Sequence, residues 1–120
     1  MSAPSSTTDV RVVLVTAPSE EEGARIARTL VEERLVACVN IVPGVRSVYR
    51  FEGKVFDERE ALLVMKTSVD CTNALVARVR ALHTYTVPEV LALDVATGSA
   101  AYLDWVFAET RPHATTERGP

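Results

Sequence analysis

Apolar residues along the chain recur in two patterns, one typical of strands and the other typical of helices. Residues Val10 to Thr16 are β-branched and almost continuously apolar, which predicts a buried strand. Ser19 and Glu22 then form a capping box, and apolar side chains follow at helical spacing, which predicts a helix over residues 19–34. The acidic residues in its first turn complement the helix dipole, so we interpret them as structural and not as a metal site.

The next part of the sequence predicts a long β-hairpin. Residues 36–50 are apolar and then alternating, and a Pro-Gly pair at 43–44 interrupts them, which indicates one strand with a kink or bulge. After a tight reversal at the Glu-Gly pair 52–53, residues 54–66 run back, polar at first and then apolar.

This hairpin is too long to lie within a compact body. A strand over residues 54–66, at about 3.3 Å per residue, extends about 43 Å, whereas a compact domain of this length has a radius of gyration of about 14 Å. Strand edges that project beyond a domain must be paired, because exposed edges invite aggregation. We therefore predict a homo-oligomer whose subunits share strands, with a flexible arm as the alternative.

The second half of the chain completes the pattern. Apolar residues from Cys71 to Leu82 share one helical face, which predicts a helix from residue 68 or 69 to residue 82. Residues 90–95 predict a short strand, and Ser99 opens a last helix. The order is that of a ferredoxin-like α+β fold, βαββαβ, with an added C-terminal helix.

Composition places the chain among single-domain globular proteins. It has 120 residues, 48% hydrophobic and 24% charged, and no apolar run approaches the ~20 residues that span a membrane. We expect one domain over residues 10–110 between disordered tails at 1–9 and 111–120. Residues 1–9 lack the features of a secretory signal, so we expect a soluble cytoplasmic protein with no membrane partner. A net charge of −3 disfavours nucleic acid as a partner.

The connection over residues 82–89 is the first place to look for chemistry. His83, Tyr85 and Glu89 lie within it, and Pro88 favours an extended backbone that aims Glu89 along the next strand. Loops that join regular elements often carry functional groups. The alternative is that His83 caps a helix C-terminus and that Glu89 is a solvated strand edge.

Other functions of ferredoxin-like domains fit this sequence poorly. The strand from residue 54 is acidic with a single Phe, unlike the aromatic strands that stack RNA bases. The first loop lacks the Arg or glycine-rich nest that phosphoryl chemistry needs. The two cysteines form neither a disulfide framework nor a close-spaced zinc pair, and we expect Cys38 and Cys71 to be small buried apolar groups. No nucleophile with an evident base appears, although Cys38 and His83 could meet in space, and we expect no enzyme.

Several segments in order carry a resemblance to a known family. They are the first-strand end at 15–18, Glu33-Arg34-Leu35-Val36-Ala37-Cys38-Val39-Asn40-Ile41-Val42-Pro43-Gly44, Ser47-Val48-Tyr49-Arg50-Phe51-Glu52-Gly53-Lys54, Lys66-Thr67, the loop 83–89 and Tyr102-Leu103-Asp104-Trp105. From about residue 12 to residue 105 the chain resembles the CutA1 family of divalent-cation tolerance proteins. The resemblance implies a PII-like subunit that forms a tight homotrimer through its long hairpin strands.

The resemblance also implies a function in copper and divalent-cation tolerance, with metal binding. It suggests His83, Glu89 and, less directly, Cys38 as ligands of Cu2+ or another divalent cation. Imidazole and carboxylate suit Cu(II) or Zn(II), and a thiolate suits Cu(I) or Zn(II). The sparse ligand set predicts weak or intersubunit sites. It further implies cleft or interface roles for Tyr49, Phe51, Lys66, Tyr85 and Trp105.

Three positions depart from the pattern of the family. Some members carry a cysteine where this chain has Val15, and many have proline and tryptophan where it has Thr84 and Phe51. A metal site that depends on that cysteine is therefore lost. The alternative function is a PII-like regulatory or scaffold trimer that binds a small molecule or an unidentified protein at intersubunit clefts near the hairpin.

Overall fold

The computed structural model describes residues 9–110, so the predicted tails at 1–9 and 111–120 lie outside the described residues except for residue 9. Its strands form one antiparallel sheet in the order β2-β3-β1-β4. The elements in chain order are β1 Val10–Ala17, α1 Glu20–Glu32, β2 Cys38–Phe51, β3 Lys54–Ser68, the 3-10 turn Val69–Cys71, α2 Thr72–Leu82, β4 Leu91–Asp94 and α3 Ala100–Glu109. The predicted ferredoxin-like order with an added helix is confirmed.

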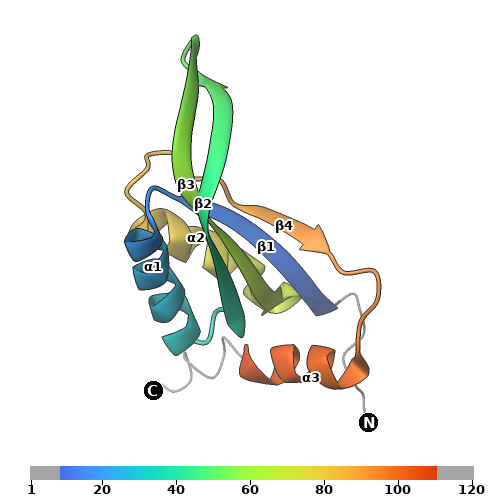
Figure 1. Cartoon of the computed structure of the whole chain (residues 1–120). Coiled ribbons are helices and arrows are strands. Elements are labelled where there is room, and N and C mark those ends of the chain that lie inside the picture. Colours follow the sequence, from blue (N-terminus) through green and yellow to red (C-terminus); the bar gives the residue numbers. More distant parts are fainter. Residues whose placement is uncertain (1–8, 111–120) are drawn as a thin grey trace.

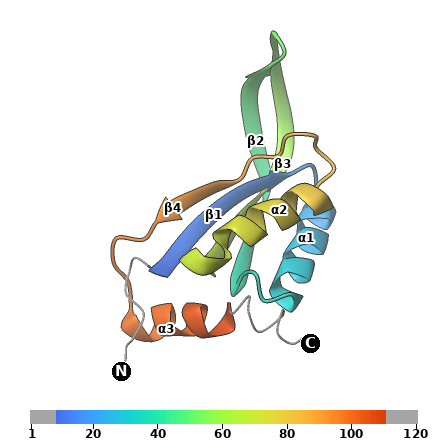
Figure 2. The same cartoon turned by 180° about the vertical axis from the view of Figure 1, so that it is seen from behind.

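Helices α1 and α2 cover one face of the sheet, as the view from behind shows (Figure 2). The core lies between them and the central strands β1 and β3. Its fully buried side chains alternate along the strands and recur at helical spacing on the helices: Val13, Val15, Ile26, Leu30, Leu63, Met65, Leu75 and Val79. Helix α3 crosses one end of the sheet, where Leu103 and Val106 pack against Val10 (Figure 1).

The ends of α1 follow from local chemistry. The Ser19 side chain accepts the backbone N–H of Glu22 at 3.1 Å, which confirms the predicted cap. The helix ends at Glu32, two residues before the predicted end, because Arg34 adopts a left-handed φ of 62° and turns the chain toward β2.

The hairpin β2–β3 projects beyond the body (Figure 1). Glu52 and Gly53 both have positive φ, 52° and 80°, as a tight two-residue hairpin turn requires. The predicted kink is a break in register between Val42 and Val45, and Gly44 takes a φ of 70° there. The overhang predicted from strand length is therefore confirmed.

The sheet face opposite α1 and α2 is only partly covered. Val12, Leu14, Leu62 and Val64 are half-buried on it, because the residues that alternate with them fill the core. The edge strand β4 is exposed along its whole length and contributes further leucines to this face. An apolar face of this kind is typical of a surface that meets another chain, so the homo-oligomer stays a prediction with a structural basis.

The structure corrects three details of the sequence prediction. A 3-10 turn over Val69–Cys71 precedes α2, which therefore begins at Thr72 and not at 68 or 69. Strand β4 covers Leu91–Asp94 and not the predicted residues 90–95, because only these four residues pair with β1. Cys71 is buried as expected, but Cys38 is half-buried because it begins the edge strand β2. No helix within residues 9–110 is long and apolar enough to cross a membrane.

Candidate functional site

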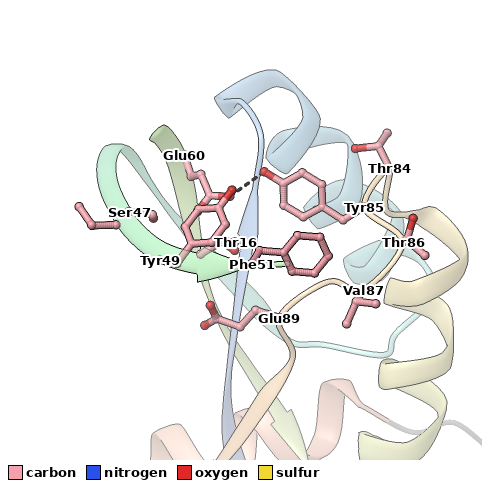
Figure 3. Close-up of a pocket in the computed structure, with 11 residues that line it drawn as sticks. Thr16, Ser47, Tyr49, Phe51, Glu60, Thr84, Tyr85, Thr86, Val87 and Glu89 are labelled. Atoms are coloured by element: carbon pink, nitrogen blue, oxygen red, sulfur yellow. Dashed lines mark hydrogen bonds between the residues drawn. The ribbon is translucent and has the colours of Figure 1, made fainter. Parts of the chain in front are cut away.

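A cavity of about 730 Å³ lies between the hairpin, the end of β1 and the loop that follows α2 (Figure 3). The hairpin supplies residues of both its strands, β1 supplies Thr16, and the loop closes the other side. The lining combines two carboxylates, three aromatic rings and small polar or aliphatic side chains: Glu60, Glu89, Tyr49, Phe51, Tyr85, Thr16, Ser47, Thr84, Thr86, Val48 and Val87. Such a mixed lining is typical of a binding site for a small ligand.

Glu60 and Tyr85 join the hairpin to the loop. The Tyr85 hydroxyl donates a hydrogen bond to Glu60 Oε2 at 2.6 Å, shown as a dashed line in Figure 3. Burial raises the pKa of the Tyr85 hydroxyl well above its usual value, and the hydrogen bond to the Glu60 carboxylate adds to the effect. The Tyr85 hydroxyl therefore remains a hydrogen-bond donor, and Glu60 is held in a fixed position at the cavity wall.

A second tyrosine is oriented in the same way on the hairpin itself. The Tyr49 hydroxyl donates to Glu58 Oε1 at 2.7 Å, which raises the pKa of Tyr49 to about 12. Its ring stacks on Phe56 of the opposite strand with centroids 5.3 Å apart. This cross-strand pair fixes the hairpin wall of the cavity.

Glu89 brings a second carboxylate to the cavity. The residue is exposed, but partial burial of its carboxyl group raises its pKa above the usual value, and the negative charge of Glu60 raises it further. Neither carboxylate forms a salt bridge with any described residue, and the residues that line the cavity include no Lys, Arg or His. The cavity therefore carries negative charge, and no Lys, Arg or His among the described residues lines it.

His83 lies at the C-cap of α2, as the alternative interpretation of the loop predicted. Its ring is buried, and Nδ1 accepts the backbone N–H of Tyr85 at 3.0 Å. Nε2 therefore carries the proton in this arrangement and donates to the Thr16 carbonyl oxygen at 2.7 Å. Both ring nitrogens are used to fasten the loop to β1, so neither is open to a metal ion in this conformation.

Cys38 lies at the opposite end of the sheet from His83. It pairs with Lys66, which pairs with Val12, whereas His83 contacts Thr16 four residues further along β1, about 13 Å away at strand spacing. Within residues 9–110, no group of three or more His, Cys, Asp or Glu side chains could hold a metal ion. The structure thus does not bring the three predicted ligands together, and it separates the Cys38 thiol from the His83 base.

Cys38 has its own surroundings, which include two of the residues predicted for a cleft. Lys66 Nζ donates to Asn40 Oδ1 and lies 3.9 Å from Cys38 Sγ. On α3, the rings of Tyr102 and Trp105 are 5.6 Å apart, and the pKa of Tyr102 is raised by burial and then by the nearby Cys38. Lys66 and Trp105 therefore belong to this end, away from the cavity.

Of the predicted residues, Glu89, Tyr49, Phe51 and Tyr85 do line one cavity. The sequence analysis missed Glu60 among the candidates. Its signal was present, because Glu60 is the last acidic residue before the apolar run of β3 and shares a strand face with half-buried side chains. On that face, which lies opposite the helix-covered core, Glu60 is directed toward the cavity.

Comparison with known proteins gives a consistent result. Residues 11–109 match the family model described as CutA1 divalent ion tolerance protein. The chain is 54% identical over 99 residues to the divalent-cation tolerance protein CutA of Thermus thermophilus, covering 82% of this chain and 96% of that protein.

Two solved structures are similar along most of the chain. The crystal structure of CutA1 from Oryza sativa has a TM-score of 0.84 and 48% identity, covering 88% of this chain and 98% of that one. A structure titled as the PII-like protein CutA from Nostoc sp. PCC 7120, in apo form, has a TM-score of 0.79 and 41% identity, covering 84% and 98%.

Proposed function

The chain belongs to the CutA1 divalent ion tolerance family, and from this premise we propose that it is a homotrimeric cation-binding protein whose site is the cavity beside the hairpin. One observation carries the proposal: Glu60 and Glu89 line the same cavity and no described residue supplies a cation to either. Carboxylates that are partly withdrawn from water and lack a counterion favour binding of a positive ligand.

Divalent cations, copper among them, are the first candidate ligands, because the family is described by tolerance to such ions. Glu89 and Glu60 offer oxygen ligands, and His83 would add a nitrogen only if its ring left Thr16. Cys38 would belong to a separate site. Since one subunit offers an incomplete set, we propose that a neighbouring subunit completes the coordination of the ion.

The trimer is part of this proposal. The open sheet face, the exposed β4 and the projecting hairpin together offer apolar surface and unpaired strand edges to neighbouring chains. Light scattering should give about three times the 13.1 kDa subunit mass. Leu91→Glu on β4 should yield smaller species, whereas Val76→Glu, a matched change on α2, should not.

Calorimetric titration of Cu2+ into the chelator-treated full chain tests the cation site. His113→Gln should be present throughout, because an imidazole can bind copper on its own and residue 113 lies outside the described residues. We expect saturable binding that Glu89→Gln and Glu60→Gln weaken about tenfold each, as for lost charged ligands. Glu21→Gln removes the same charge from the exposed first turn of α1 and should leave binding unchanged. Equal binding in all variants would contradict a metal site in the cavity.

His83→Gln separates two versions of this site. If the imidazole binds the ion after leaving Thr16, the substitution should abolish binding as strongly as Glu89→Gln does. If His83 only fastens the loop, it should lower the free energy of unfolding and leave the affinity for Cu2+ nearly intact. The geometry of the ring favours the second result.

A second candidate function is a PII-like trimer that binds a small molecule or a protein. It is favoured by the size of the cavity and its aromatic wall, which exceed what a bare metal ion needs. We also propose a cytoplasmic location, as predicted from the sequence.

A further inference from the structure

The buried carboxylate of Glu60 has hydrogen-bonding capacity that the fold leaves unused. Only 7% of Glu60 is exposed to solvent. Its Oε2 accepts the Tyr85 hydroxyl, but among the described residues no donor reaches Oε1. Removing a carboxylate from water without a cation is unfavourable, so a positively charged partner that arrives from outside is favoured.

Glu89 places a second negative charge across the same cavity. The two carboxylates are close enough for the charge of Glu60 to raise the pKa of Glu89. Glu60 comes from the hairpin and Glu89 from the loop before β4, so a ligand between them would contact both walls (Figure 3).

The other residues that line the cavity indicate the chemistry of the rest of the ligand, here called its body. Phe51 is 49% exposed and has no ring partner among the described residues, unlike Tyr49 and Tyr85. Val48 and Val87 are also exposed and line the cavity. Exposed apolar groups beside one buried and one exposed carboxylate match a molecule with a charged end and an apolar end.

A bare divalent ion matches this lining less well. Hard ions such as Mg²⁺ and Ca²⁺ take six or more oxygens at short range, about 2.0 to 2.6 Å. One subunit offers two carboxylates in about 730 Å³, and its described residues contain no cluster of three ligating side chains, so a metal ion would depend on ligands from a neighbouring subunit. A metal ion would also leave Phe51 and Val87 exposed to water.

We propose that the cavity binds a small organic cation, a protonated amine with an apolar body, whose ammonium lies between Glu60 and Glu89 while its body covers Phe51. The inference rests on the proposed function, since it takes the cavity to be the cation site and names its class of ligand. The ammonium donates to Glu60 Oε1 and to the Glu89 carboxylate, and so supplies the charge that the protein lacks.

Three probes with nearly the same body and different charge test the proposal. They are phenethylamine, which is cationic, 2-phenylethanol, which is neutral, and 3-phenylpropionate, which is anionic. Each is titrated into the full chain, with affinity from calorimetry and location from backbone amide NMR shifts. The amine should bind at least about tenfold more tightly than the alcohol, as for a charged hydrogen-bonded contact, and the acid should not bind. Shifts should centre on Tyr85 and Glu89 and spare Trp105.

Substitutions then separate the two ends of the ligand. Glu60→Gln keeps an acceptor for the Tyr85 hydroxyl, and with Glu89→Gln it should reduce the affinity for the amine to that for the alcohol. Phe51→Ala should weaken amine and alcohol alike, because it removes contact with their common body. Glu21→Gln is the charge-matched control and should change neither affinity.

The outcomes distinguish the inference from the proposed function. Equal binding of the amine and the alcohol would overturn a cationic ligand while leaving the cavity as a binding site. Binding of Cu2+ at the cavity with no binding of the amine would overturn the inference and support the metal site. Absence of binding by Cu2+ and by all three probes would overturn both.

Discussion

Charged and apolar side chains have opposite surroundings on the helix-covered side of the sheet and at the cavity end. Between the two helices, Glu33 at the C-cap of α1 accepts two hydrogen bonds of 2.8 Å from Arg78 of α2, and this contact lowers the pKa of Glu33. At the cavity, Glu60 and Glu89 have no such cation, and the pKa of Glu89 is raised. The first arrangement stabilises the fold, whereas the second leaves a charge for a ligand to satisfy.

Apolar side chains show the same difference. Leu63 of β3 is fully buried between the helices and the sheet, whereas Val48 of β2 is 64% exposed beside the cavity. Both lie on long strands of one hairpin, so the position along the strand decides the role of the residue. The part of the hairpin over the body forms the core, and the part beyond it forms a binding wall.

The largest expected effect tests the apolar half of this comparison. Leu63→Ala should lower the free energy of unfolding by about 3 kcal/mol, because it opens a cavity in a closely packed core. Val48→Ala should change it by less than about 0.5 kcal/mol. Urea unfolding at one fixed protein concentration measures both, since assembly contributes to apparent stability. A large loss for Val48→Ala that grows on dilution would show that Val48 belongs to the proposed trimer contact of the hairpin and not to a free cavity wall.

Removal of the Tyr85 hydroxyl tests how much its hydrogen bond to the Glu60 carboxylate contributes to the stability of the fold. Tyr85→Phe should cost about 1 to 2 kcal/mol, because it leaves buried Glu60 without that hydrogen bond. Tyr49→Phe deletes the same type of contact, to Glu58 on the exposed hairpin, and should cost clearly less because water screens it. Thermal or urea unfolding of the two variants compares them directly, and equal losses would show that burial of Glu60 does not matter.

Two isosteric substitutions compare the charges themselves. Glu33→Gln should cost about 0.5 to 1 kcal/mol, since it breaks a partly exposed bidentate ion pair. Glu60→Gln should cost less, or should stabilise the protein, because it removes a buried charge that has no cation. Urea unfolding at neutral pH provides the measurement. If Glu60→Gln were the more destabilising change, an unrecognised cation would have to reside in the cavity.

Much of this arrangement was predictable from local sequence. The cap at Ser19, the turn at 52–53 and the bulge near 43–44 each depend on a few adjacent residues, and all were confirmed. The overhang followed from strand length alone. The pairing of Glu60 with Tyr85 was not predictable, because it joins residues 25 apart through the curvature of the hairpin and the path of one loop.

The metal-ligand predictions show the same limit. His83 was identified from its residue type, but the use of its ring depends on the carbonyl of Thr16, which lies 67 residues away in the sequence. Cys38 was judged from an apolar run, and the run could not reveal which end of the sheet it would occupy. Residue chemistry predicts which groups can bind, whereas tertiary contacts decide which of them are already engaged.

The smallest effect is a difference in pH dependence. Because the pKa of Glu89 is raised in the folded protein, the folded state binds more protons than the unfolded chain just above the ordinary carboxyl range, and stability falls as pH rises there. For Glu33 the pKa is lowered, so its contribution is present above the ordinary range and is lost as pH falls. Relative to the unsubstituted protein, Glu89→Gln should therefore gain stability as pH rises just above the ordinary carboxyl range, whereas Glu33→Gln should lose stability as pH rises toward that range from below.

Unfolding in urea at several pH values below and above the ordinary carboxyl range, without added ligand, measures both slopes, and Glu21→Gln serves as the control for a carboxylate with neither environment. Slopes of the same sign for Glu89→Gln and Glu33→Gln would mean that Glu89 already has a cationic partner in the assembled protein, supplied by a neighbouring subunit. Opposite slopes would mean that the assembled cavity keeps its uncompensated charge, and a ligand that adds a positive charge should then abolish the slope of Glu89 alone.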